Sequence, residues 1–129
     1  MLKQIGTVLL LITAFHLHSQ TALEMPKKLD LGIKKGDASI VARFFNENLE
    51  MAIEGDENIY SARQAEFVLQ KFFRAHKPKS FYINHQGGKT NTSYIIGTLS
   101  TENGSFKMIL LLKKSDVSVK IHQLRIENE

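Results

Sequence analysis

Between Ser80 and Glu127 the sequence contains four strand-like segments in succession, which limits the chain to folds built on an antiparallel sheet. The segments are 81–86, 92–101, 105–114 and 117–127. Apolar and polar residues alternate in each of them, as is typical of a strand with one buried face. Only short turns separate the segments, and short turns join antiparallel strands, whereas parallel strands need a long crossover.

Asn103-Gly104 is the clearest of the turn signals in this region. Both central residues of the favoured two-residue hairpin need a positive φ, and Asn-Gly meets that requirement well. A two-residue turn here predicts that Glu102 faces Ser105 and that Gly97 faces Leu110. One face of the hairpin is then apolar throughout and is expected to receive the helices; it consists of Ile95, Gly97, Leu99, Phe106, Met108, Leu110 and Leu112.

The opposite face of this hairpin has polar ends but an apolar centre, formed by Ile96, Ile109 and Leu111. A solvated outer face is normally polar along its whole length. Exposed apolar patches of this kind often mark interaction sites. We therefore interpret these three residues as a candidate interface for a homodimer.

Two features predict a bent sheet. Gly97 lies inside a strand, where glycine often marks a bend or a bulge. The apolar alternation also changes phase between Ile121 and Leu124, so a one-residue β-bulge near His122-Gln123 would return both sides of the strand to the core. A curved sheet wrapped against helices encloses a cone, and a cone can hold a pocket.

The helical pattern is strongest over residues 62–75. Ser61 and Gln64 form a capping box at its start, and Pro78 ends it. Its apolar stripe has the spacing of a helix that packs on a sheet, and consists of Ala65, Val68, Leu69, Phe72 and Phe73. A second helix is expected to begin with Asp37 as its N-cap.

The segments around these two helices are less regular. Leu49, Met51 and Ile53 alternate with polar or small residues as in a half-buried strand, and a helix continuing through Ile53 is the competing interpretation. The cluster 55–58 is interpreted as a turn. Residues 21–35 show little periodicity, and Pro26 and Gly32 argue against one continuous helix there. We treat 21–35 as a lead-in segment and 36–129 as a single domain.

Residues 1–20 are typical of a signal peptide, with Lys3 before a short apolar run and a more polar exit. The run is too short for a stable membrane span, which takes about 20 apolar residues. The protein is therefore expected to be exported, to the periplasm or the extracellular space. The chain has no cysteine, which excludes disulfides and thiol chemistry. Its lysine doublets are dispersed, so no basic stripe indicates a nucleic-acid partner.

Several short strings resemble a small family of secreted bacterial proteins known only as a domain of unknown function (number 4783). They are Gly36-Asp37-Ala38, Tyr60-Ser61-Ala62-Arg63-Gln64-Ala65, Phe72-Phe73, Lys79-Ser80-Phe81, His85-Gln86-Gly87, Ile96-Gly97-Thr98-Leu99 and Gln123-Leu124-Arg125-Ile126. The order of elements also resembles the nuclear transport factor 2-like, or cystatin-like, superfamily. This resemblance implies an α+β cone in which two main helices pack on a curved, largely antiparallel sheet of four to five strands.

The resemblance implies no activity, because this family has none established. In the wider superfamily some members are isomerases or dehydratases, and others bind ligands or partners, often as dimers formed through the outer sheet face. No catalytic motif of an enzymatic member can be matched to this sequence position by position. The resemblance therefore assigns no catalytic residue.

Four polar residues are candidates to line a ligand-binding pocket: Tyr60, His85, His122 and Arg125. Histidine titrates near neutral pH, so His85 or His122 with a tyrosine suits proton transfer in an enzyme of the lyase or isomerase type. Structural roles compete with this interpretation. Tyr60 also fits a hydrophobic staple before the capped helix, and Arg125 fits an ion pair.

No acid–base pair and no metal-ligand spacing accompany these residues, so the sequence predicts neither a metal nor a cofactor. We therefore favour an exported, non-enzymatic domain that binds a small apolar ligand or a protein partner, such as an envelope protein. The expected homodimer uses Ile96, Ile109 and Leu111. A pocket enzyme is the alternative hypothesis.

Overall fold

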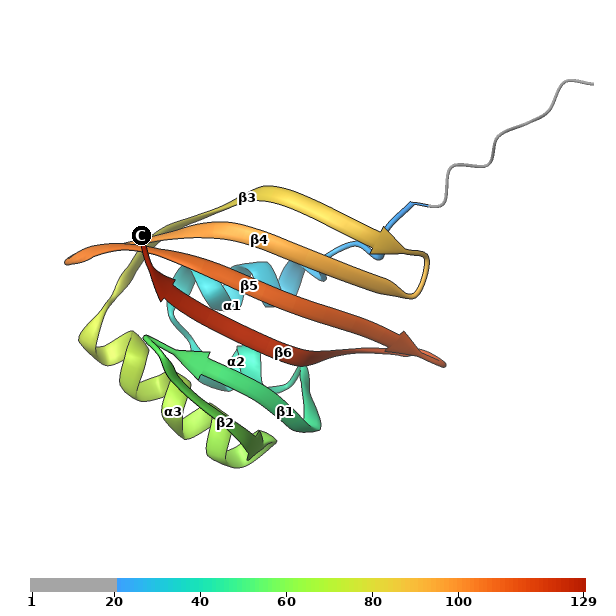
Figure 1. Ribbon diagram of the computed structural model, residues 1–129, viewed down its shortest axis with the longest axis horizontal. Helices are drawn as coiled ribbons and strands as arrows, with labels where there is room; N and C mark the ends of the chain where they lie inside the picture. Colours follow the sequence, from blue (N-terminus) through green and yellow to red (C-terminus); the bar gives the residue numbers. More distant parts are fainter. Residues whose placement is uncertain (1–20) are drawn as a thin grey trace, which may run out of the picture.

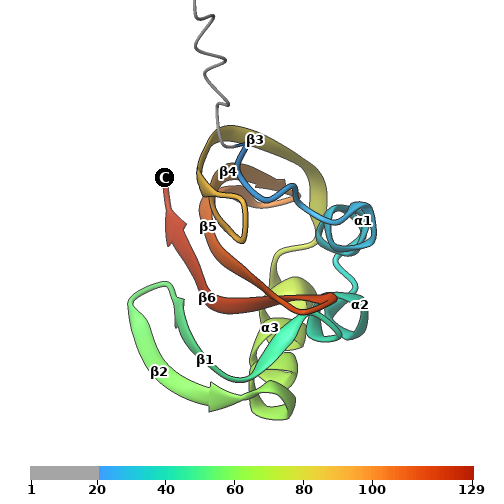
Figure 2. The same ribbon diagram turned by 90° about the vertical axis from the view of Figure 1, so that its right-hand side faces the viewer.

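A computed structural model describes residues 21–129, so the expected signal peptide at 1–20 lies outside the described residues. The elements follow in the order α1 (Lys27–Lys35), α2 (Ala38–Ala42), β1 (Phe45–Ile53), β2 (Asp56–Ser61), α3 (Ala62–Ala75), β3 (Pro78–Lys89), β4 (Thr92–Thr101), β5 (Gly104–Ser115) and β6 (Ser118–Asn128). The helices lie on one side of a curved sheet (Figure 1, Figure 2). The side without helices is called the outer face below.

The sheet has six strands in the order β2-β1-β6-β5-β4-β3. All neighbouring strands are antiparallel except β1 and β6, which are parallel. The fold is therefore α+β with an open, curved sheet, as predicted. It has three helices and six strands, however, not two main helices on four to five strands. Within residues 21–129, no helix is long and apolar enough to cross a membrane.

The additional strand is β2, which occupies most of the cluster expected as a turn. The turn consists of Glu54 and Gly55, with φ values of 51° and 89°, and Asp56 already pairs with Ile53. β2 lies at an edge of the sheet and most of its side chains are exposed. Its sequence therefore shows no alternation of buried and polar residues, which is the signal that identifies a strand.

The additional helix is α1, in the segment expected as an irregular lead-in. Pro26 stands directly before its first residue, a position that needs no backbone N–H. Gly32 lies inside the helix because α2 packs against it: a Cβ on Gly32 would lie 2.7 Å from Cγ2 of Ile40. Gly36 ends the helix in a left-handed conformation, with φ of 65°. The two residues interpreted as helix breakers therefore have roles in α1: Pro26 precedes its first residue, and Gly32 allows α2 to pack closely against it.

Asp37 caps α2, as predicted. Its carboxylate accepts hydrogen bonds from the Ser39 hydroxyl at 2.6 Å and from the backbone N–H groups of Ser39 and Ile40 at 3.0 and 3.1 Å. The bonds from Ser39 and Ile40 lower the pKa of Asp37 below its ordinary value of 3.8. The chain then enters β1, where Leu49 and Met51 are buried. The helical alternative for this segment is therefore wrong.

α3 has the predicted bounds and the predicted capping box. Ser61 Oγ accepts a hydrogen bond from Gln64 N at 3.2 Å, and Gln64 Oε1 accepts one from Ser61 N at 3.0 Å. Most of the predicted apolar stripe is buried against the sheet, namely Ala65, Leu69, Phe72 and Phe73. Strong local signals at both ends, together with an uninterrupted stripe, explain why this element is predictable.

The β4–β5 hairpin has the predicted faces but a different register. Thr101 pairs with Gly104, and Gly97 pairs with Met108 instead of Leu110. The turn is therefore Glu102-Asn103, and the positive φ in this region belongs to Gly104, at 145°. The difference amounts to two residues. Since side chains alternate with a period of two, each stays on the face expected for it.

Contacts with α3 explain this register. The side-chain amide of Asn103 donates a hydrogen bond to the Ala75 carbonyl at 2.9 Å, and its Oδ1 lies 2.9 Å from Nδ1 of His76. The Glu102 N–H donates to the Lys77 carbonyl at 3.0 Å. The hairpin turn thus holds the C-terminal end of α3. Asn103 is placed by these partners, and not by its preference for a positive φ.

The predicted bulge in β6 is confirmed. Leu111 pairs with Gln123 and Leu112 with Ile121, which leaves His122 as the extra residue. As a result, both halves of β6 direct apolar side chains to the helix side, and Ile121, Leu124 and Ile126 are fully buried. Bulges bend the strand that contains them. This one contributes to the curvature of the sheet and also turns the His122 side chain outward.

Candidate functional site

The four candidate pocket residues lie on two different sides of the sheet. Tyr60 faces α3 and the core, whereas His85, His122 and Arg125 lie on the outer face. The register pairs that place them are Leu49 with Tyr60, Ile96 with His85, Ile109 with Arg125, and Leu111 with Gln123 beside His122. The sheet separates Tyr60 from the other three, so these residues do not form one pocket. The linear pattern indicates the bulge beside His122, but it does not show on which side of the sheet Tyr60, on a distant strand, lies.

Tyr60 lines a groove between the β1–β2 hairpin and α3, with a volume of about 390 Å³. We call it the α3 groove. Its apolar walls include Ile53, Val68 and Phe67, and the Phe67 side chain is 63% exposed. The Tyr60 hydroxyl accepts a hydrogen bond from Asn58 Nδ2 at 3.2 Å. Tyr60 is also packed against the core. It therefore has a structural role and lines the groove as well.

The three candidate interface residues lie next to one another on the outer face. Ile96 pairs with Ile109, and Leu111 pairs with Tyr94. We call Tyr94, Ile96, Ile109 and Leu111 the outer-face patch. Three of them are half-buried and Tyr94 is 38% exposed. Within residues 21–129, no helix covers this side of the sheet (Figure 2), so the patch is an apolar surface that faces outward.

His122 lies at one end of this patch. With Ile59, Leu111 and Lys113 it lines a shallow groove of about 280 Å³ on the outer face. Burial, and then the nearby positive charge of Lys113, lower the pKa of His122 below its ordinary value of 6.5. The folded protein therefore favours the neutral imidazole, because a charged ring would be partly desolvated beside a cation.

Protonation of His122 is expected to lower stability in weak acid. The unfolded chain binds the proton at the ordinary pKa of 6.5, whereas the folded chain binds it only at lower pH. The contribution of neutral His122 to the free energy of unfolding is therefore fully present above pH 6.5. It is lost as the pH falls through the folded-state pKa of His122. Urea denaturation at pH 7.5 and 5.5 measures this. His122→Gln is expected to reduce the loss, while His85→Gln, at an exposed position, leaves it unchanged; equal losses in both variants would contradict the assignment.

His85 and His122 do not form an acid–base pair. His85 is on β3 and His122 on β6, with β4 and β5 between them. Neighbouring strands are about 4.8 Å apart, so the two residues are separated by roughly 14 Å across the sheet. Direct proton transfer between groups needs hydrogen-bond distance. Among residues 21–129, no group of three or more His, Cys, Asp or Glu side chains could hold a metal ion.

Arg125 takes part in two ion pairs, in agreement with the structural interpretation of this residue. Its Nη1 lies 3.4 Å from Glu57 Oε1, and its Nε lies 3.4 Å from Glu127 Oε1. The Arg125 side chain is 30% exposed. Exposed pairs of this kind contribute little stability, about 0–1 kcal/mol. Their effect here is to place charged groups around the outer-face patch.

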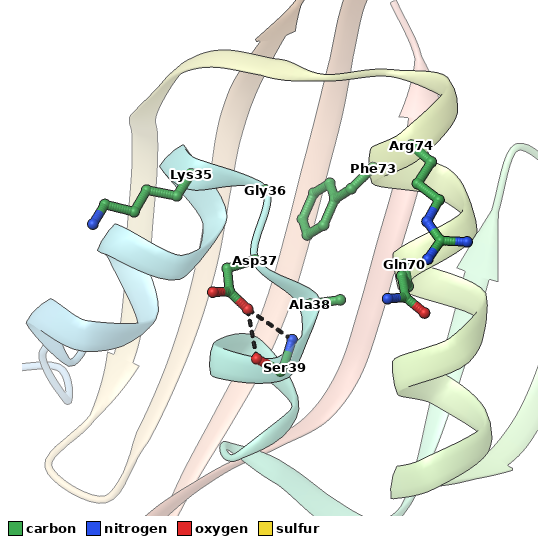
Figure 3. A pocket seen from close by; sticks show the side chains of 8 residues that line it. All are labelled: Lys35, Gly36, Asp37, Ala38, Ser39, Gln70, Phe73 and Arg74. Atoms are coloured by element: carbon green, nitrogen blue, oxygen red, sulfur yellow. Dashed lines mark hydrogen bonds between the residues drawn. The ribbon is translucent and has the colours of Figure 1, made fainter.

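Another shallow pocket, of about 370 Å³, lies between the α1–α2 turn and α3 (Figure 3). The cationic groups of Lys35 and Arg74 lie on opposite sides of Asp37 in this view. The Asp37 carboxylate is already bonded to Ser39 as an N-cap. A Cβ on Gly36 would lie 2.7 Å from Cδ of Pro78. The string Gly36-Asp37-Ala38 is therefore explained by packing and capping.

Helices on one face of an open, curved sheet define an α+β fold, and this fold is similar to that of solved nuclear transport factor 2-like and cystatin-like proteins. A cystatin-like domain of unknown function from Nostoc punctiforme superposes with a TM-score of 0.63 at 10% identity, over 79% of this chain and 71% of the other. The model of a family described as a domain of unknown function (DUF4783) matches residues 27–127. The chain belongs to this family.

Solved structures of the same family are similar over almost their whole length. The protein from Bacteroides ovatus has a TM-score of 0.77 and 30% identity, covering 84% of this chain and 98% of its own. The protein from Bacteroides uniformis has a TM-score of 0.77 and 28% identity, covering 82% and 98%. No curated protein is significantly similar to the chain. The comparisons thus establish the family and the fold and assign no activity.

Proposed function

We propose that this protein is an exported, non-enzymatic domain that forms a homodimer through the outer-face patch. The observation that supports this most directly is the apolar centre of a sheet face that no helix in the described part of the chain covers. Tyr94, Ile96, Ile109 and Leu111 form two adjacent pairs on β4 and β5. Interfaces commonly have such an apolar core within a polar rim. Export is supported by the signal-like pattern of residues 1–20.

The surroundings of the patch suit a self-complementary contact. Lys107 on β5 and Glu127 on β6 are register partners on the outer face. In the row that contains Leu111, the next residues across the sheet are Gln123 on β6 and Glu50 on β1. Charges of both signs therefore border the apolar centre, and such a rim can be complementary to itself in a two-fold contact between identical surfaces. A stable dimer buries about 1,600 Å² in total, so the contact would extend from the patch onto this charged rim.

Leu111→Asp is expected to convert the dimer to a monomer. The substitution places a carboxylate at the centre of the proposed interface, where it would be desolvated without a partner. Losses at central apolar positions are large, so the dimer Kd should rise by at least about thirtyfold. Analytical ultracentrifugation at micromolar concentration measures this change.

Val117→Asp is the matched control, because Val117 is 94% exposed at the β5–β6 turn, away from the patch. This variant should remain dimeric. A wild-type protein that is monomeric at micromolar concentration, with the patch solvated, would contradict the proposal.

A small apolar ligand in the α3 groove is a second candidate function. It is supported by the exposed Phe67 and by the apolar walls of a groove of about 390 Å³. Pockets for small molecules are typically of this size and largely apolar. Native mass spectrometry of the purified protein distinguishes the two candidates. A dimer mass supports the interface, a small additional mass supports the ligand, and a bare monomer supports neither.

A further inference from the structure

The open edge of β3, the last strand of the sheet, has no role assigned above. The described chain contacts this edge near the end of the strand, where Leu23 N–H donates to the Lys89 carbonyl at 3.0 Å. Gln86 Nε2 in turn donates to the Leu23 carbonyl at 3.0 Å. Between Lys79 and Ile83, no other backbone group in residues 21–129 pairs with the open side of the strand. One end of this edge thus already accepts an extended segment, while its middle is available.

A groove runs beside the available part of the edge. It lies between α1 and β3 and has a volume of about 370 Å³. Its residues are Met25, Lys27, Asp30, Lys34, Phe81, Tyr82 and Ile83. The Tyr82 side chain is 68% exposed and that of Ile83 is 43% exposed. These two residues pair with Thr98 and Gly97 and so lie on opposite faces of the sheet. An added strand would find one apolar contact on each face.

The surroundings of this groove are strongly basic. The segments 21–35 and 77–89 contain seven lysines and two acidic residues, a net charge of +5. The rest of residues 21–129 contains nine Lys or Arg and eleven Asp or Glu, a net charge of −2. The positive charge of the described chain is therefore concentrated along α1 and β3. Complementary potentials select the partner and speed its association.

We propose that the β3 edge binds an extended, acidic segment of another protein as an added strand beside α1. The backbone of that segment would pair with Lys79–Ile83, a length of about 17 Å. Its alternate side chains would contact Ile83 in the groove and Tyr82 on the outer face. Its carboxylates would lie near Lys27 and Lys79, whereas Lys34 is already paired with Asp30 at 2.8 Å. Addition of a strand to an open sheet edge is a recurring mode of peptide recognition.

Protection of the edge against aggregation is the competing explanation of the same lysines. Edge strands often contain lysine, proline and bulges that prevent pairing, and β3 has Pro78 at its start and register irregularities at Lys79 and at Asn84. These features disfavour pairing of β3 with another lysine-rich strand edge, including β3 of a second copy of the chain. They do not account for the groove or for the exposed Tyr82 and Ile83. An acidic segment is the occupant that lysines attract instead of repelling.

Fluorescence anisotropy with three labelled ten-residue peptides tests the proposal. The first repeats Glu-Glu-Val-Val, so that each face of the added strand contains both residue types; the second has lysine in place of glutamate; and the third is the glutamate peptide with two valines replaced by proline. The first should bind and the second should not. The third keeps the charge but loses backbone N–H groups, so it should bind at least about tenfold more weakly if main-chain pairing contributes. Amide hydrogen exchange should show new protection at 79–83.

Charge-reversed variants locate the site. Lys27→Glu with Lys79→Glu should weaken binding of the glutamate peptide by roughly tenfold, because two attractive pairs become repulsive. Arg63→Glu with Lys71→Glu, at exposed positions of α3, makes the same change in net charge and should have little effect. Leu111→Asp should bind the peptide normally, which separates this site from the dimer interface.

Three outcomes overturn the proposal. Equal binding of the glutamate and proline peptides would show charge attraction without strand addition. Equal weakening by both pairs of charge reversals would place the peptide elsewhere. Protection of 79–83 that rises with protein concentration in the absence of peptide would show that a second copy occupies the edge.

Discussion

Gly97→Ala is expected to lower the free energy of unfolding by about 3 kcal/mol, although it adds a single methyl group. A Cβ at this position would lie 2.5 Å from Cε2 of Phe81 and 2.7 Å from the carbonyl oxygen of Tyr82. Phe81 is 2% exposed, so its ring has little room to move, and the Tyr82 carbonyl belongs to the backbone of the paired strand. Overpacking of this kind forces shifts in both side chain and backbone.

Urea denaturation of the variant and the wild type measures this effect. Gly87→Ala is the matched control on β3, because the nearest atom to a Cβ at Gly87 is His85 Nε2 at 3.9 Å. That control should change stability by less than about 1 kcal/mol. Phe81→Leu in the Gly97→Ala background should restore part of the loss. If Gly97→Ala and Gly87→Ala are equally stable, the close contact with Phe81 does not constrain the fold.

Phe106→Ala should have an effect of similar or larger size, about 3–5 kcal/mol. Phe106 is 3% exposed and joins the sheet to the C-terminal end of α3. Its ring meets that of Phe72 edge-on, with centroids 5.1 Å apart, and that of His76 at 4.8 Å. Truncation would leave a cavity at this junction. The loss of contact should also weaken the hydrogen bonds that Asn103 makes to Ala75 and His76.

Thermal and urea denaturation of Phe106→Ala test this prediction, with Phe67→Ala as the control on the exposed side of α3. The Phe67 side chain is 63% exposed, so its removal should cost less than about 1 kcal/mol. Amide hydrogen exchange should in addition be fastest in the last turn of α3 for Phe106→Ala. A loss spread evenly over the chain would mean that Phe106 does not specifically hold this end of the helix.

The elements that are predictable from sequence have complete local signals. α3 has a capping box and an unbroken apolar stripe, β4 and β5 alternate throughout, and the bulge at His122 follows from a change of phase within one strand. Two elements lack such signals. β2 is exposed at the sheet edge and shows no alternation, and α1 contains Gly32, which is unfavourable in an isolated helix but is required by the close approach of Ile40.

The candidate sites were predictable to different extents. Ile96, Ile109 and Leu111 share a face in any register that differs by an even number of residues, so the two-residue error in the hairpin did not affect them. For the candidate pocket residues, no comparable rule fixes a common face. His85, His122 and Arg125 are separated from Tyr60 by the sheet itself, and no local pattern records the side of the sheet on which a distant residue lies. The β3 edge groove was also missed, because it requires α1.

The amino-acid sequence by itself determined the α+β class, the bounds of α3, the apolar faces of β4 and β5, and the phase change in β6. Each depends on residues close together in the chain, where periodicity and capping are sufficient. The tertiary structure alone decided the turn at Glu102-Asn103, the helix through Gly32 and the edge position of β2. These depend on contacts between distant segments, such as Asn103 with the end of α3, whose energies outweigh local preference.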